Sequence, residues 1–192
     1  CKLVQLKEVA NSYKMFGKDY EYSTALSSFM INHIKKKYIK IKKEKIIKKN
    51  SKILDVGSND GTFLNFFNNP SRLFGIDPSA KKFLKNYKKR TTIMFDFFSK
   101  KKILQNLKKD INFDLITSFA MFYDVSDPNS FCADINELLT PEGLWILEIS
   151  YLPLMLKNLT YDQICHEHVT FYTLTVFKNI IEKNNLKIVD IN

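Results

Sequence analysis

The chain has 192 residues, a hydrophobic fraction of 45% and a formal net charge of +10. This length and composition suit one globular domain with a sizeable core, and no apolar run approaches membrane-spanning length. The N-terminus has no signal-like stretch and three cysteines form no disulfide framework, so we expect a cytoplasmic protein with no membrane partner.

The positive charge is carried almost entirely by lysine. Of 30 basic residues, only Arg72 and Arg90 are arginine. Specific contacts to bases and phosphates are made mainly by the forked guanidinium group of arginine. Because arginine is rare here, we expect no nucleic-acid partner. The densest lysine run, residues 35–49, keeps apolar residues at helical spacing. This favours the solvated face of a helix over an RNA- or membrane-binding stripe.

The first strong helical pattern follows Ser23. Ser23 or Thr24 can cap a helix that runs to about Asn50. Its apolar stripe would consist of Leu26, Met30, Ile34, Tyr38 and Ile41. The chain begins with Cys1 and not with Met, so we expect it to be a piece of a longer protein.

The most informative segment is residues 51–64. A short apolar run at 53–56 predicts a buried strand, and a small polar loop follows before an amphipathic segment begins at Gly61. The loop has the spacing Asp55-x-Gly57-x-x-x-Gly61, with Asn59 inside it, and it lacks the Gly-Lys-Ser/Thr ending of a phosphate-cradling loop. The second apolar run, 73–76, ends in Asp77, which is placed to accept hydrogen bonds from ribose hydroxyls. The alternative is a generic strand, turn and helix without a ligand.

Strand and helix patterns alternate along the rest of the chain. Strands are predicted at 53–56, 73–76, 92–95, 113–117, 144–149 and 186–191, and helices at 61–68, 79–88, 101–109, 129–139 and 174–184. This alternation predicts an α/β fold with a doubly wound, mostly parallel sheet and an N-terminal helical extension. Ligands of such sheets bind beyond the carboxyl ends of the strands, where Gly57, Asp77, Asp96 and Phe119 fall.

The loop and Asp77 together resemble motif I and the ribose-binding acid of class I S-adenosylmethionine-dependent methyltransferases. Residues 113–128 and the turn Thr140-Pro141-Glu142-Gly143 resemble later motifs of the same superfamily. The resemblance implies a Rossmann-like methyltransferase fold, S-adenosyl-L-methionine as cofactor, and adenine contacts from Asp96 and Phe97; the alternative for these two is a loop acid and a core phenylalanine. The implied cofactor-binding residues are Asp55, Gly57, Asn59, Gly61, Asp77, Asp96, Phe97 and Phe119.

A second unusual segment is residues 161–172, where two of the three histidines flank a carboxylate in Cys165-His166-Glu167-His168. Three interpretations are open: a zinc site, a polar loop, and general base catalysis by an imidazole beside a carboxylate. Four consecutive residues cannot all wrap one tetrahedral ion, and no second ligand cluster is present, which weighs against zinc. A strong base matters where the methyl acceptor is a carbon next to a carbonyl.

This segment resembles the signature of sugar C-methyltransferases that act on nucleotide-linked keto-deoxysugars. The N-terminal Cys-Lys-Leu-Val-Gln-Leu and the stretch Asp19-Tyr-Glu-Tyr-Ser23 fit the same family. The resemblance implies His168 as general base, Glu167 as its assistant and Tyr22, or its neighbour Tyr20, against a nucleotide-sugar substrate.

The same resemblance implies a domain order. Residues 1–50 would be a linker and helix after a four-cysteine zinc module whose last ligand is Cys1, with zinc only in the full-length protein. Residues 51–192 would be the methyltransferase core, cut short at its C-terminal side, where a sheet edge would be left open. Two positions depart from the family pattern: Cys165 replaces a frequent tyrosine and Asp124 replaces a frequent histidine, which indicates a different branch.

Other functions stay open at this point. A nucleic-acid methyltransferase would carry an Asn/Asp-Pro-Pro-aromatic motif where this chain has Phe119-Ala-Met-Phe122. A methyltransferase for another small molecule, or a non-catalytic binding domain of the same fold, are the remaining alternatives. The sequence leaves the oligomeric state open.

Overall fold

The computed structural model describes residues 2–17, 19–68, 72–108 and 110–192. Its centre is a five-stranded sheet in which every neighbouring pair is parallel. The order is β4-β3-β2-β5-β6, so the strand order reverses between β2 and β5. A crevice opens beyond the carboxyl ends at such a switch point. The strands are β2 (Lys52–Val56), β3 (Arg72–Ile76), β4 (Thr91–Met94), β5 (Phe113–Phe119) and β6 (Leu139–Glu148).

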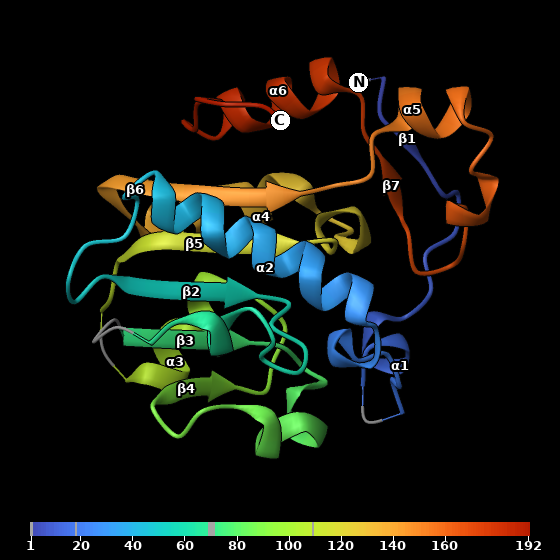
Figure 1. The fold of residues 1–192 in the computed structure, drawn as a ribbon. Helices are drawn as coiled ribbons and strands as arrows, with labels where there is room; N and C mark the ends of the chain where they lie inside the picture. The colour runs from blue at the N-terminus through green and yellow to red at the C-terminus, as the bar shows by residue number, and fades with distance from the viewer. Residues whose placement is uncertain (1, 18, 69–71, 109) are drawn as a thin grey trace.

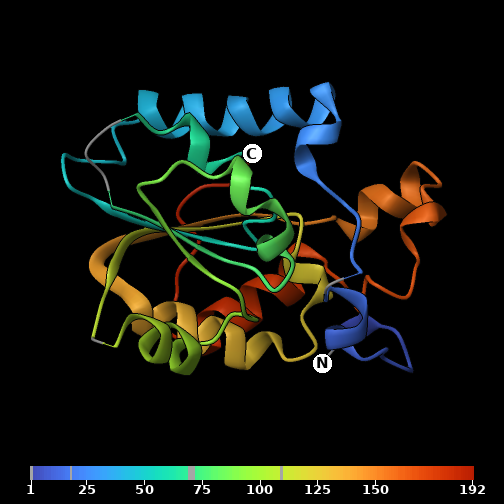
Figure 2. The ribbon, with the colours of Figure 1, turned by 90° about the horizontal axis from the view of Figure 1, so that it is seen from below.

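Helices cover both faces of this sheet, giving three layers (Figure 1, Figure 2). One face carries α2 (Ser28–Lys43), whose Ile34 and Ile41 belong to one buried cluster with Ile53 of β2. The next residue, Leu54, belongs to the cluster on the opposite face, as the two-residue period of a strand requires. That face is covered by α3 (Lys100–Leu107), α4 (Pro128–Leu138) and α6 (Leu174–Lys183). The predicted doubly wound α/β fold is confirmed.

A small second sheet lies past the carboxyl ends of the main strands (Figure 1). In it, β1 (Val4–Gln5) pairs antiparallel with β7 (Thr170–Phe171), and the Leu6 amide donates to the Val169 carbonyl at 2.9 Å. The short helices α1 (Ser12–Met15) and α5 (Leu152–Lys157) also lie at this end. The N-terminal segment is therefore tied to the chain that directly follows His168.

The N-terminal helix is shorter than predicted at both ends. It begins at Ser28 with Ser27 as its cap and ends at Lys43, and only a 3-10 turn, Thr24–Leu26, precedes it. The start is late because Asn59 and Asp60 accept the backbone N–H groups at positions 24 and 25, which ties those groups to another part of the chain. Leu26, which was expected in the apolar stripe, is 82% exposed.

Two other predicted helices are 3-10 turns, Leu64–Phe66 and Ala80–Asn86. After β2 the Asp60 carboxylate accepts the Thr62 N–H at 3.0 Å, and this side-chain bond competes with a regular helical start. The predicted helices near α3, α4 and α6 are confirmed, except that Lys109 lies outside the described residues.

The predicted strand at 186–191 is wrong. Residues 186–192 make no ladder within the described chain, and β6 lies at one edge of the five-stranded sheet. Leu186 and Ile188 instead pack side chains against the core, and Lys40 of α2 contacts Asp190 at 3.2 Å. The apolar pattern indicated this packing only in part, since Val189 and Ile191 are exposed, and an apolar pattern does not ensure backbone pairing. No helix among the described residues has both the length and the apolar character needed to cross a membrane.

Candidate active site

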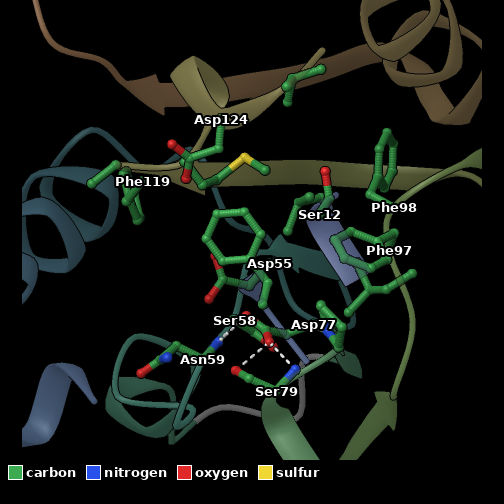
Figure 3. A pocket seen from close by; sticks show the side chains of 18 of the residues that line it. Ser12, Asp55, Ser58, Asn59, Asp77, Ser79, Phe97, Phe98, Phe119 and Asp124 are labelled. Atoms are coloured by element: carbon green, nitrogen blue, oxygen red, sulfur yellow. Dashed lines mark hydrogen bonds between the residues drawn. The ribbon is translucent and has the colours of Figure 1, made fainter. Parts of the chain in front are cut away.

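A cavity of about 680 Å³ lies at the carboxyl ends of β2, β3, β4 and β5. Figure 3 shows it from close by, with Asp55, Asp77 and Asn59 on one side and Asp124 with Phe119 on the other. The N-terminal segment and the segment of Glu167 and His168 also line it. Its volume is within the range typical of small-molecule and cofactor sites. Every residue predicted for the cofactor except Gly61 lines this cavity.

The loop after β2 depends on its two glycines. Gly57 has a φ of +71° and Gly61 a φ of +79°, values that favour glycine. A Cβ at Gly61 would also lie 2.6 Å from the ring of Tyr87. The Tyr87 hydroxyl donates a hydrogen bond to the Asn59 carbonyl at 2.7 Å. Gly57 therefore lines the cavity, whereas Gly61 does not line it and affects only the conformation of the loop.

The Asp77 carboxylate fixes the loop to the end of β3. One oxygen accepts the Asn59 N–H at 2.9 Å, and the other accepts the Ser79 N–H at 2.7 Å and the Ser79 hydroxyl at 2.6 Å. Figure 3 shows these bonds converging on one side of the cavity. Asp77 lines the cavity but is only 8% exposed, and its hydrogen bonds hold the carboxylate in one position. Sequence reasoning missed Ser79.

Asp55 is the most deeply buried acid of the lining, with 4% exposure. Burial raises the pKa of its carboxyl to about 7, although a 2.7 Å hydrogen bond from the Thr117 hydroxyl opposes the shift and Asp77 adds to it. Because this pKa lies near neutral pH, a cationic group that binds beside the carboxyl favours its ionised form.

The next strand end supplies the two residues predicted to contact adenine. Asp96 forms an ion pair with Lys102 at 2.9 Å and accepts the Phe97 N–H at 2.9 Å. The Phe97 ring meets the ring of Tyr13 edge-on, with centroids 4.6 Å apart. Tyr13 belongs to α1, a helix that the sequence analysis did not predict, and it also lines the cavity. Phe119 lies farther along the lining, at the end of β5.

The residues predicted for catalysis lie together in the lining of the cavity, at the end opposite the residues predicted for the cofactor. Glu167 and His168 line it, together with Tyr20, Tyr22 and Tyr123. The Nδ1 atom of His168 lies 2.7 Å from the Gln163 carbonyl oxygen, which can only accept, so Nδ1 carries the proton. The Nε2 atom is then the unprotonated nitrogen of the neutral ring, and it has no partner in the described part of the chain. The ring packs on Tyr123 with centroids 4.4 Å apart.

Two polar residues of the loop after β2 hold the backbone of residues 22–25 in place. Asn59 accepts the Thr24 N–H at 3.0 Å and donates to the Tyr22 carbonyl at 2.9 Å. Asp60 accepts the Ser23 hydroxyl and the Ala25 N–H, both at 2.6 Å. We call Asn59 and Asp60 the loop clamp. The sequence predicted no contact between them and the N-terminal segment, although adjacent polar residues beside a buried strand were a usable signal.

Metal binding finds no support in this geometry. No group of three or more His, Cys, Asp or Glu residues among those described could hold a metal ion, so the described geometry gives no support to the zinc interpretation of residues 165–168. Cys1, the proposed last ligand of a zinc module, lies outside the described residues. Cys165 is partly buried and free of any disulfide.

The site fits S-adenosyl-L-methionine on its own residues. Gly57 removes a side chain from the lining, Asp77 presents a fixed carboxylate, and Asp55 adds a buried carboxyl poised to ionise beside a cation. The cofactor carries ribose hydroxyls and cationic groups that match these features.

Comparisons with known proteins agree with this assignment. The sequence pattern of the methyltransferase-domain family matches residues 21–191. The C-methyltransferase NovU of Streptomyces niveus is 26% identical over the whole chain, which covers 46% of NovU. The tRNA U34 carboxymethyltransferase of Campylobacter lari is 29% identical over 67% of the chain and 43% of that protein. The chain thus spans less than half the length of either relative.

Solved structures share the fold at low sequence identity. The cyclopropane synthase MmaA2 from Mycobacterium tuberculosis aligns with a TM-score of 0.59 at 13% identity, covering 88% of this chain and 65% of that one. The phosphoethanolamine N-methyltransferase 2 of Haemonchus contortus, solved in complex with S-adenosyl-L-methionine, aligns with a TM-score of 0.55 at 16% identity, covering 78% and 36%.

Proposed function

The chain belongs to the class I S-adenosylmethionine-dependent methyltransferases, and we propose that it is a C-methyltransferase for a nucleotide-linked keto-deoxysugar. The methyl group would go to the carbon next to the sugar ketone. The observation that carries this proposal is that Glu167 and His168 line the same cavity as the cofactor loop. The likeness to the C-methyltransferase NovU over the whole chain supports it.

The proposed roles follow from the two ends of the cavity. Backbone amides of the 57–61 loop would bind the methionine part of the cofactor, and Asp77 would bind its ribose. The bound cofactor supplies an electrophilic methyl group. Because the Nδ1 proton of His168 is donated to the Gln163 carbonyl, the lone pair of the neutral ring is on Nε2. This nitrogen would remove the proton beside the ketone, and much of the rate would come from holding carbon and methyl at near-attack distance.

Tyr20 and Tyr22 would close the acceptor end. Both line the cavity, the loop clamp holds the backbone at Tyr22, and the Tyr22 side chain is 48% exposed. Burial and the nearby Glu167 raise the pKa of Tyr20, so its hydroxyl stays protonated and can donate to a sugar oxygen. A nucleic-acid methyltransferase and a non-catalytic binding domain are the alternatives that the test must separate.

The test compares His168→Asn with His166→Asn, since His166 is exposed and outside the cavity lining. Turnover is measured on a panel of nucleotide keto-sugars, and solvent deuterium exchange into the acceptor reports proton removal. We expect His168→Asn to lose about 10²–10⁴ in turnover and to lose the exchange, with cofactor affinity within about threefold.

The His166→Asn control should keep both activities. Exchange that persists in His168→Asn would assign the base to another residue. Absence of cofactor binding by calorimetry in the wild type would support the non-catalytic alternative, and methylation of tRNA but of no keto-sugar would support the nucleic-acid alternative.

A further inference from the structure

Asp124 is an acid of the same cavity for which neither the proposed mechanism nor the cofactor assignment has a use. It ends the 3-10 turn Phe122–Asp124, directly after β5, and it lines the cavity. In Figure 3 it lies beside Phe119 and away from Asp77 and Ser79. Asp124 therefore belongs to the acceptor end and not to the ribose side.

The turn that carries Asp124 is held firmly from both sides. Phe122 is fully buried and packs on Trp145 and Tyr172 with centroids 5.5 Å and 5.2 Å apart. The Tyr123 carbonyl accepts the Thr170 hydroxyl at 3.1 Å, and the Tyr123 ring packs on His168. The carboxyl of Asp124 is thus fixed by its neighbours in the chain, on the same side of the cavity as the proposed base.

The Asp124 carboxyl has a buried oxygen atom without a hydrogen-bond partner among the described residues, unlike Asp55, Asp77 and Asp96. Asp55, Asp77 and Asp96 each accept hydrogen bonds from the protein. The Oδ1 atom of Asp124 is buried, and no described residue donates to it. A buried polar atom without a partner costs about 1–3 kcal/mol. Because Asp124 lines the cavity, a ligand group bound there can offer its carboxyl a hydrogen-bond partner.

The surroundings also decide which form of the carboxyl is present. The acid that acts on it is Glu167, from the segment before β7, and the other titratable groups at this end of the cavity are Tyr20, Tyr22, Tyr123 and His168. Burial, with Glu167 adding to it, raises the pKa of Asp124 to about 8. At neutral pH the group is therefore a protonated acid that can donate a hydrogen bond.

Resting on the proposed function, we propose that Asp124 is a further catalytic residue, whose carboxyl donates a hydrogen bond to the acceptor's ketone oxygen and holds that oxygen while it is negatively charged. When His168 takes the proton, the C–H electron pair forms the C=C bond and the carbonyl π pair moves to oxygen. The carbon then takes the methyl group, the C=O bond re-forms, and the electron pair of the broken carbon–sulfur bond stays on sulfur. Asp124 keeps its proton throughout, and the enolate is stabilised where its charge develops.

The experiment compares Asp124→Ala, Asp124→Asn and the control Asp110→Asn, since Asp110 is exposed in the loop before β5. Deuterium exchange into the acceptor and turnover should fall by about 10²–10³ in Asp124→Ala, the usual effect of losing one oxyanion donor. Asp124→Asn retains a neutral donor of the same shape and should stay within about tenfold of the wild type. The control should equal the wild type, and calorimetry should show cofactor affinity unchanged in all three.

A pH profile separates a donor from a merely structural group. Wild-type turnover should fall as the pH rises through about 8, because the Asp124 carboxyl then loses its proton. That alkaline limb should be absent in Asp124→Asn, which has no proton to lose. Exchange within about threefold of the wild type in Asp124→Ala would overturn the role of Asp124 and leave the proposed function standing. A wild-type protein that neither exchanges nor methylates any keto-sugar would overturn the proposed function, and the role of Asp124 with it.

Discussion

The loop clamp makes a sharp prediction, because Asp60 joins the cofactor loop to the N-terminal segment through buried hydrogen bonds. Asp60 is 1% exposed. Its Oδ2 accepts the Ser23 hydroxyl and the Ala25 N–H at 2.6 Å, and its Oδ1 accepts the Thr62 N–H at 3.0 Å and the Thr62 hydroxyl at 2.6 Å. Replacing this carboxylate with the isosteric amide in Asp60→Asn leaves the packing unchanged and alters only these bonds.

The magnitude follows from what an amide can accept. An asparagine has one acceptor oxygen, so either orientation leaves a backbone N–H, that of Ala25 or that of Thr62, facing an amide N–H. A buried donor without an acceptor costs about 1–3 kcal/mol, and the remaining bonds weaken because the acceptor is no longer charged. We expect Asp60→Asn to lower the free energy of unfolding by about 2–4 kcal/mol.

Urea unfolding measures that loss, and amide hydrogen exchange locates it. Protection should fall most at residues 22–26, because those residues are the ones held by the clamp. The exposed Asp19→Asn removes the same charge from the neighbouring chain and should change stability by less than about 0.5 kcal/mol. If Asp60→Asn is as stable as this control, or if protection at 22–26 does not change, the clamp does not hold the rim of the cavity.

Three further predictions concern the cofactor half of the site. Asp77→Asn should weaken S-adenosylmethionine binding by about 1.5–3 kcal/mol in a folded protein, measured by calorimetry, and unchanged affinity would remove Asp77 from the ribose site. Asp55 has a pKa of about 7 in the folded protein, against a usual value of 3.8. As the pH rises between these values, the unfolded chain loses this proton before the folded protein does, so the free energy of unfolding falls. Asp55→Asn should therefore gain up to about 4 kcal/mol relative to the cofactor-free wild type between pH 4 and pH 8, and equal pH dependence of the two proteins would contradict the shift. Gly61→Ala should destabilise by more than about 1 kcal/mol in thermal or urea unfolding, since the residue has a positive φ and its Cβ would meet the Tyr87 ring; an unaffected Gly61→Ala would show that the loop can relax.

The positions of the residues proposed to bind the cofactor could be predicted because strand ends can be recognised in a sequence. The runs at 53–56 and 73–76 are apolar apart from Asp55, as is typical of strands buried on both faces, and the residue after each run falls at the carboxyl edge. The positions of Gly57 and Asp77 follow from that rule alone. The ends of helices were harder to predict from the sequence. The start of α2, for example, is set by hydrogen bonds to Asn59 and Asp60, which are distant in sequence.

The acceptor half could be identified only as a motif, since its assembly depends on contacts that leave no pattern. The strands β1 and β7 are two residues long, and their pairing is too short to produce an apolar alternation. Tyr13 and Tyr123 enter the cavity through elements of three or four residues, below the length at which periodicity indicates a helix. The strand predicted at 186–191 shows the converse, because a clear alternation there packs side chains without pairing backbones.

The same contacts connect the two halves of the site. The Asn59 N–H is fixed by Asp77 on the cofactor side, while the Asn59 side chain binds the backbone at Tyr22 and Thr24 on the acceptor side. A ligand that orders the loop should therefore also order the backbone at Tyr22 and Thr24, since Asn59 belongs to both hydrogen-bond sets. Binding energy gained at the ribose end is thereby available to position the acceptor end, which gives a physical reason for the acceptor to bind better after the cofactor than before it.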